Sequence, residues 1–236
     1  MKKKVALIAN GWNGENLDAF ICGCQAFYDE EEFDLFVFTS YSLTSFAYGL
    51  QDAENSLYSM PDYSFFDAAI ILGSGINKHD GIDDIVAKCK EAGIPVVVQG
   101  FDVEGLPSVT ISNYTGMKGI CDHIIENHQV KDVFFFAGDK GNRDSNERLQ
   151  ALKDSLKAHG LQFNDENVLY TNWDGHTVNN YITSLNGDKS KLPDAFVCAN
   201  DTIAMFALTS LETNGFMTPE DVIVTGFDNI KEAREY

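Results

Sequence analysis

Short runs of apolar residues recur along this chain, separated by segments with helical spacing. The runs are rich in Val, Ile and Phe and do not alternate with polar residues, which is typical of strands buried on both faces of a sheet. Strands of this kind alternating with helices predict an α/β fold with parallel strands and right-handed crossovers. Eight runs fit: VALIA from Val5, LFVF from Leu35, AAIIL from Ala68, IPVVV from Ile94, DVFFF from Asp132, NVLY from Asn167, AFVCA from Ala195 and VIVTG from Val222.

Three of the intervening segments carry an apolar stripe that recurs every three or four residues. Such a stripe predicts a helix with one face against the core. The residues of the three stripes are Met117, Ile120, Cys121, Ile124 and Ile125; Leu149, Leu152 and Leu156; and Ile203, Phe206, Ala207 and Leu211.

Eight strands could close one barrel or divide into two open sheets, and the segment 105–119 (GLPSVTISNYTGMKG) favours division. It follows the fourth strand without an intervening helix, carries its own short extended run over 109–112, and then opens a long helix. The sequence therefore predicts two Rossmann-like lobes with parallel sheets, an N-terminal lobe of residues 1–112 and a C-terminal lobe of residues 113–236.

The charge of the chain argues against nucleic acid and membrane partners. Its 236 residues include 17 Lys and Arg against 36 Asp and Glu, a formal net charge of -19. Such a surface repels phosphate backbones and anionic lipid headgroups. The apolar run at the start is about five residues long, shorter than the core of a signal peptide at roughly 7 to 15. We therefore expect no direct nucleic acid binding, no membrane anchor and a cytoplasmic location.

The cysteines and the common catalytic motifs indicate neither a metal site nor an enzyme. Cys22, Cys89, Cys121 and Cys198 stand in apolar context, and no spacing typical of zinc ligands occurs; we expect mostly buried, reduced thiols. A dinucleotide fingerprint from GSG at 73–75 would need glycine where Lys78 stands, and no P-loop, nucleophile elbow or H-E-x-x-H is present. We predict no cofactor, no metal and no catalysis. His79 and His176 are candidate pocket residues because they follow predicted strands.

Polar and aromatic residues gather directly after the predicted strands. Because the carboxyl ends of parallel strands meet at one edge of a sheet, these side chains are expected to converge. A guanidinium, carboxylates, amides and indole rings together suit a small polyhydroxylated ligand, since the polar groups bind hydroxyls and the rings cover apolar sugar faces. The candidates are Asn10 and Trp12 after the first strand, Arg148 in the opening turn of the helix after the fifth, Trp173 and Asp174 after the sixth, Asn200 and Asp201 after the seventh, and Asp228 and Asn229 after the eighth.

Four motifs in order, GDKGNRDSNERLQAL, NWDGHT, PDAFVCANDTIAMFAL and VIVTGFDN, resemble the ligand-sensing core of the lactose-repressor (LacI) family within the periplasmic-binding-protein-like superfamily. The resemblance covers nearly the whole chain and implies two lobes of like topology, joined by three crossovers, with a ligand in the cleft. By motif, it implies that Arg148, Asn200 and Asp228 bind the ligand and that Trp173 stacks on it. It also implies that Asn200 faces the ligand while Asp201 caps the following helix.

Three departures from the family pattern matter. The family's helix-turn-helix does not precede the first strand, Ser112 stands where an aspartate is common, and the chain stops at Tyr236 soon after GFDN, where the family continues with closing strands of the first lobe. We expect a piece of a longer protein, with a first lobe left incomplete at the C-terminus. A fused output domain beyond Tyr236, such as a GGDEF diguanylate cyclase or a kinase, would suit a sensor.

The predicted function is small-molecule sensing by a homodimer in a bacterial regulatory or signalling protein. A sugar-like ligand that bridges Arg148 and Asp228 in one lobe to Asn10 and Trp12 in the other would favour lobe closure. Two alternatives remain open at this point. One is a solute-binding protein of a transporter, and the other is an α/β enzyme whose carboxylates would be Asp174, Asp201 and Asp228.

Overall fold

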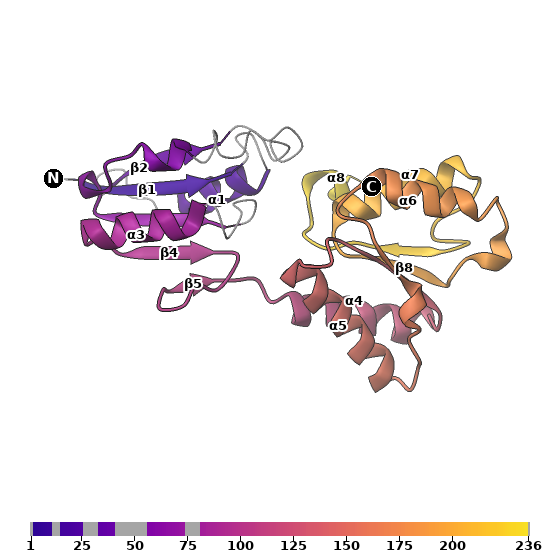
Figure 1. Ribbon diagram of the computed structural model, residues 1–236. Coiled ribbons are helices and arrows are strands. Elements are labelled where there is room, and N and C mark those ends of the chain that lie inside the picture. The colour runs from indigo at the N-terminus through magenta and orange to yellow at the C-terminus, as the bar shows by residue number, and fades with distance from the viewer. Residues whose placement is uncertain (1, 11–14, 26–32, 41–55, 74–80, 236) are drawn as a thin grey trace. The chain divides into compact units, whose positions relative to one another are not determined.

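The computed structural model describes residues 2–10, 15–25, 33–40, 56–73 and 81–235 (Figure 1). The chain divides into two compact units, Met1–Ile111 and Ser112–Tyr236. Each unit is built on one sheet whose strands are all parallel, with helices in the crossovers between them. The predicted fold class, two α/β lobes with parallel sheets, is therefore confirmed.

The first unit holds a five-stranded sheet with the order β2-β1-β3-β4-β5. All eight strand predictions of the chain correspond to strands, and the short extended run at the end of this unit forms a ninth, one residue earlier than expected. The elements described are β1 (Lys3–Ala9), α1 (Glu15–Gln25), β2 (Phe33–Thr39), η2 (Tyr63–Phe65), β3 (Ala68–Leu72), α3 (Asp83–Ala92), β4 (Val96–Gln99) and β5 (Ser108–Val109).

Strand β1 supplies core to both faces of this sheet, because successive side chains of a strand point to opposite faces. Ala6 and Ile8 join a cluster with residues of η2, α3 and β4. Leu7 joins a smaller cluster with Leu17 of α1. The lack of polar alternation in β1 thus reflects burial on both faces, as the sequence predicted.

The second unit holds a four-stranded sheet with the order β7-β6-β8-β9. Helices α4 and α5 contact each other, as do α6 and α7, and the two pairs cover opposite faces of the sheet (Figure 1). The elements are α4 (Asn113–His128), β6 (Val133–Ala137), α5 (Arg143–Ala158), η4 (Asp165–Asn167), β7 (Val168–Tyr170), α6 (Gly175–Ser184), η5 (Lys189–Lys191), β8 (Ala195–Cys198), α7 (Asp201–Thr213), β9 (Ile223–Thr225) and α8 (Lys231–Arg234).

The two sheets share one ordering rule: the first strand of each sheet lies between its second and third. The crossovers on either side of that first strand therefore run to opposite faces, and a crevice opens at the carboxyl ends of the strands. In the second unit this position falls between β6 and β8. Arg148 and Asp228 meet beside the end of β8, next to this position.

Three sequence predictions about burial are wrong in part. Strands β2, β7 and β9 are edge strands and are only partly buried, whereas β6 and β8 are buried throughout. Phe206 does not join the core stripe of α7, because its ring covers the backbone of Gly175 on α6 instead. Cys22 is exposed and Cys24 partly so, while Cys89, Cys121 and Cys198 are buried as expected.

Within the part of the chain described, no helix combines the length and the apolar character needed to cross a membrane.

Candidate functional site

Arg148 is the buried cation at the centre of the candidate site. Helix α5 begins at Arg143 with Asn142 as its N-cap, so Arg148 is the sixth helical residue and lies in the second turn. The sequence prediction had placed it in the opening turn, where the helix dipole disfavours a cation. The extra turn removes that conflict and carries the side chain into the interior, where only 4% of the residue is exposed.

The Arg148 guanidinium has three acceptors and one aromatic neighbour. Its Nε donates to Asn113 Oδ1 at 2.9 Å, its Nη1 to the Ala199 carbonyl at 2.6 Å, and its Nη2 lies 3.2 Å from Asp228 Oδ1. The guanidinium carbon lies 3.9 Å from the centre of the Phe227 ring, a cation–π distance. These contacts fix the orientation of a side chain that would otherwise be costly to bury.

Asn113, which the sequence analysis did not single out, orients Arg148 from the other side. It is the first residue of α4 and is buried. Its Oδ1 accepts from Arg148, and its Nδ2 donates to Asp144 Oδ1 at 2.9 Å. The amide thus links a buried cation to a carboxylate. The available signal was weak, an asparagine opening a helix directly after an extended segment.

The loop after β9 brings Asp228 to Arg148 through a left-handed backbone. Asp228 has φ 102° and Asn229 has φ 57°, a region that Asp and Asn tolerate better than most residues. The loop is held by Asp201, whose N–H donates to the Phe227 carbonyl at 2.8 Å and whose Oδ2 accepts from Ile230 N at 2.9 Å. The GFDN motif is therefore a loop shaped around Asp201.

The cap of α7 is Asn200, and not Asp201 as the resemblance implied. Asn200 is the N-cap of α7, and its Oδ1 accepts from Ile203 N at 2.9 Å. Asp201 is buried and turns toward the GFDN loop instead of capping the helix. The cap uses one acceptor site of the Asn200 oxygen, and the Nδ2 group is the donor that Asn200 could offer to a ligand. The prediction that Asp201 is the cap is wrong, while ligand contact by Asn200 stays a prediction.

Burial and attraction act against each other in the Arg148–Asp228 pair. Burial raises the pKa of the Asp228 carboxyl, and Arg148 opposes that shift; the nearby Asp201 adds to it. Burial likewise lowers the pKa of Arg148, against the attraction of Asp228. The Asp228 side chain is 34% exposed whereas that of Arg148 is 5% exposed. The carboxylate is therefore the member of the pair that a solvent-borne ligand can reach.

Trp173 lies at the same edge of the sheet, after β7. Its indole ring covers Gly138 at the end of β6, where an added Cβ would come within 2.2 Å of the ring. Trp173 has φ 63° and Asn172 has φ 51°, and a left-handed conformation is unusual for a bulky side chain. Strain of this kind is frequent where a side chain serves binding. Trp173 is 37% exposed, so one part of the ring is open to solvent.

The predicted site residues of the first unit are described only in part. Asn10 follows β1 and is half-buried, and its Oδ1 accepts from the hydroxyl of Ser40, which follows β2. Asn10 thus stands at the carboxyl end of its strand, as expected. Trp12 and His79 lie outside the described residues. His176, in the first turn of α6, is exposed and its N–H donates to Asp174.

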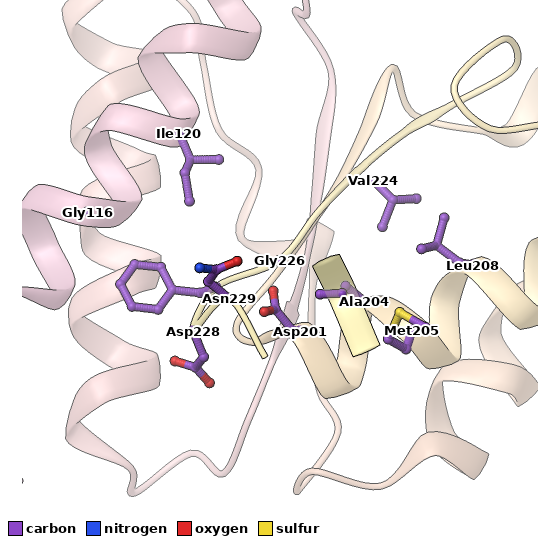
Figure 2. A pocket seen from close by; sticks show the side chains of 12 residues that line it. Gly116, Ile120, Asp201, Ala204, Met205, Leu208, Val224, Gly226, Asp228 and Asn229 are labelled. Atoms are coloured by element: carbon purple, nitrogen blue, oxygen red, sulfur yellow. The ribbon is translucent and has the colours of Figure 1, made fainter. Parts of the chain in front are cut away.

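A pocket of about 470 Å³ adjoins the Asp228 loop inside the second unit (Figure 2). Ile120 of α4 stands on one side of it, and Val224 of β9 and Leu208 of α7 stand on the other. Asp228 and Asn229 lie at its polar end. Arg148, Trp173 and Asn200 do not line this pocket, so it meets the candidate site only at the Asp228 loop.

The carboxylates proposed for an enzyme each serve the protein itself. Asp174 caps α6 by accepting from His176 N and Thr177 N, and a side-chain hydrogen bond from Thr177 lowers its pKa. Asp201 holds the GFDN loop and Asp228 pairs with Arg148. Over the described ranges, no group of three or more His, Cys, Asp or Glu side chains could hold a metal ion. Each of these three carboxylates is therefore engaged in a contact within the protein.

Comparison with known proteins identifies one matching domain family and many solved structures with a similar fold. The family model described as a periplasmic binding protein domain matches residues 68–236. Catabolite control protein A of Staphylococcus xylosus is 28% identical over 167 residues, which is 70% of this chain and 48% of that protein. The chain thus spans about half the length of the curated relatives it matches.

Two solved structures show the same fold over nearly all of the chain. A complex of the transcriptional regulator CelR with cellobiose has a TM-score of 0.72 at 23% identity, covering 97% of this chain and 68% of its own. An ABC transporter periplasmic solute-binding protein from Actinobacillus succinogenes with bound D-allose has a TM-score of 0.76 at 18% identity, covering 100% of this chain and 81% of its own.

Proposed function

This chain belongs to the periplasmic binding protein domain family, as a ligand-binding core of the LacI type, and we propose that it binds a sugar or a closely related polyhydroxylated molecule without converting it. The observation that carries the proposal is the Arg148–Asp228 pair at the carboxyl ends of the strands of the second unit. A sugar hydroxyl can donate to the carboxylate and accept from the guanidinium at once, which a purely apolar or purely charged ligand cannot do.

The surroundings of the pair support the same ligand class. The partly exposed indole of Trp173 offers a flat apolar surface to the ring of a sugar. The Nδ2 group of Asn200 supplies a donor at the end of β8. The relatives with bound cellobiose and D-allose are sugar complexes of the same fold, and they favour a saccharide for this chain.

The proposed mechanism is ligand-dependent closure of the two units. Arg148 and Asp228 would bind one side of the ligand, and Asn10 and Trp12 of the first unit the other. A ligand shifts such an equilibrium only by as much as it prefers the closed state. Closure would be passed on through a homodimer to an output domain, a DNA-binding or signalling module of the same protein.

Transport is the second candidate, because a solute-binding protein of an ABC transporter has the same fold. The full reading frame distinguishes the two. A signal peptide ahead of these residues would favour transport, whereas a DNA-binding or cyclase domain in the same frame would favour sensing.

Thermal unfolding tests the binding proposal directly, because a ligand that binds only the folded protein raises the melting temperature. Pentoses, hexoses, cellobiose and nucleosides form the screen. For a ligand found in this way, Asp228→Asn is expected to weaken binding by about 1.5–3 kcal/mol, the typical loss of a hydrogen bond to a charged group, or roughly 10- to 100-fold in Kd.

Asp165→Asn is the matched control, since Asp165 lies at the opposite end of β7 and its side chain is 85% exposed. Equal affinity of the Asp228→Asn and Asp165→Asn proteins would contradict the assigned site. A chain that no sugar or nucleoside stabilises would contradict the proposed ligand class.

A further inference from the structure

We propose that this site selects by charge: it accepts a neutral polyhydroxylated ligand and excludes the phosphorylated or carboxylated form of the same molecule. This inference rests on the proposed function, because it concerns the ligand of the same site. It goes further by dividing sugars from sugar phosphates, two ligand classes that the fold alone does not separate.

The first argument is the local balance of charge. Arg148 is the only cationic residue that is buried within the described part of the chain. Three carboxylates lie close enough to act on it, namely Asp228, Asp144 and Asp201. The nearby Arg143 forms an ion pair with Glu147, with 2.7 Å between Nε and Oε1, and its side chain is about half exposed. Counted over these described side chains, the surroundings of Arg148 carry more negative than positive charge.

The second argument is that each of the three nitrogens of the guanidinium already has a partner within the protein. A phosphate is normally bound by both arms of an arginine fork. Here Nε is directed to Asn113, Nη1 to the Ala199 carbonyl and Nη2 to Asp228, and Phe227 covers one face of the group. An anion that approached the remaining N–H groups from the side of Nη2 would also face the Asp228 carboxylate.

The third argument concerns hydrogen-bond direction. The group nearest to solvent in the pair is the Asp228 carboxylate, which can only accept when it is ionised. A hydroxyl can donate to it, whereas a dianionic phosphate has no proton to offer. Even one unit charge of the phosphate, about 8 Å from a unit charge of the site at an effective dielectric constant of about 20, corresponds to repulsion on the order of 30-fold in affinity.

The test compares matched pairs by thermal unfolding and calorimetry: D-ribose with ribose 5-phosphate, D-glucose with glucose 6-phosphate, and D-allose with allose 6-phosphate. We expect at least one neutral member to bind and its phosphate to bind on the order of 30-fold more weakly or not at all. A phosphate that binds as tightly as its parent sugar overturns the inference and leaves sugar sensing in place. If no member of any pair binds, both the inference and the proposed sugar ligand fail.

Two measurements separate repulsion from a steric clash with the phosphate. Asp144→Asn removes a charge while keeping the oxygen that accepts from Asn113. It should reduce the difference in affinity between sugar and phosphate, here called the gap, several-fold. Asp165→Asn removes the same charge far from the site and should leave the gap unchanged. Added salt should also narrow the gap, because ions screen repulsion but do not relieve a clash. A gap that neither Asp144→Asn nor salt alters overturns the inference.

Discussion

The two units share an order of strands but differ in how they bury their aromatic residues. In the second unit Phe136 and Phe196 stack across β6 and β8 with ring centres 5.0 Å apart, and both are fully buried. In the first unit the aromatic cluster lies at the edge strand β2, where Phe36 contacts Phe65 edge-on at 5.7 Å. Phe36 and Phe65 are both exposed. The same topology thus supports an aromatic centre in one unit and an aromatic edge in the other.

The units also differ in the polar groups at their strand ends. In the second unit Arg148 joins α4, α5, β8 and the loop after β9 through its three acceptors. In the first unit the described strand-end contacts include hydrogen bonds between neutral groups, from the Ser40 hydroxyl to Asn10 Oδ1 and from the Tyr58 hydroxyl to the Ala9 carbonyl. We infer that the second unit holds its share of the ligand site in place before the ligand arrives, which reduces the ordering cost of binding.

The largest expected effect is loss of a central aromatic residue. Phe136→Ala should lower the unfolding free energy of the second unit by about 3–5 kcal/mol, because it leaves a cavity between β6 and β8. Phe65→Ala, at the exposed edge of the first unit, should cost about 1 kcal/mol, since less apolar area is lost.

Each unit contains one of the two tryptophans, so denaturant unfolding can be followed separately. Trp173 fluorescence in a Trp12→Phe background reports the second unit, and Trp12 fluorescence in a Trp173→Phe background reports the first. Equal losses of unfolding free energy for Phe136→Ala and Phe65→Ala would contradict the distinction between a buried aromatic centre and an exposed aromatic edge.

Arg148→Met should have the next largest effect and lower the unfolding free energy by about 3 kcal/mol. This value is the lower end of the range for breaking a buried ion pair. The lower end applies because Asp228 is 34% exposed and can be hydrated once Arg148 is gone. Arg143→Met is the matched control, since Arg143 forms an exposed i,i+4 pair with Glu147 and should cost about 0.3–0.5 kcal/mol. Urea unfolding of the two proteins measures the difference, and similar losses would show that Arg148 does not join the elements of the second unit.

Gly226→Ala should cost about 1–3 kcal/mol through overpacking, because the new Cβ would lie 2.1 Å from Asp201 Oδ1. Gly119→Ala should do the opposite and stabilise by about 0.5–1 kcal/mol, because Gly119 is exposed within α4 and nothing lies within 4 Å of an added Cβ. Melting temperatures of the two proteins give the signs. A neutral Gly226→Ala would show that Asp201 does not hold the loop closely.

The smallest effect is expected from an exposed carboxylate of the first unit. The backbone N–H of Lys4, with the side chain of Lys3, lowers the pKa of Asp67. A lowered pKa in the folded state contributes stability above the unfolded value of about 3.9, and that stability is lost as the pH falls further. Asp67→Asn should therefore make the first unit less sensitive to acid below about pH 4, as followed by Trp12 fluorescence, with Asp18→Asn as the charge-matched control. An unchanged acid transition would contradict the role of Asp67.

Much of the fold and the placement of the site could be predicted from local pattern. The eight apolar runs became strands, and the stripes of α4 and α5 face the core, except that Ile120 of α4 lines the pocket instead. Arg148 and Asp228 meet, because parallel strands bring their carboxyl ends to one edge. The predictions that were wrong concern the face of a helix on which a side chain lies, or its position along the helix. Phe206 covers Gly175 instead of joining the core, and Arg148 lies a turn deeper than predicted because α5 begins at Arg143.

The amino-acid sequence by itself determined the order of strands and helices, the parallel sheets and the edge at which polar residues gather, because periodicity and capping are local properties of the chain. Only the tertiary structure decided which strands are edges, that Asn200 rather than Asp201 caps α7, and that Asn113 orients Arg148. Those outcomes depend on partners that are remote in sequence. The backbone N–H of Ile230 donates to the carboxylate of Asp201, and Arg148 donates to Asn113, which lies 35 positions earlier in the chain. A hydrogen bond between such residues produces no periodic pattern in the sequence, because it forms only when the fold places the two elements side by side.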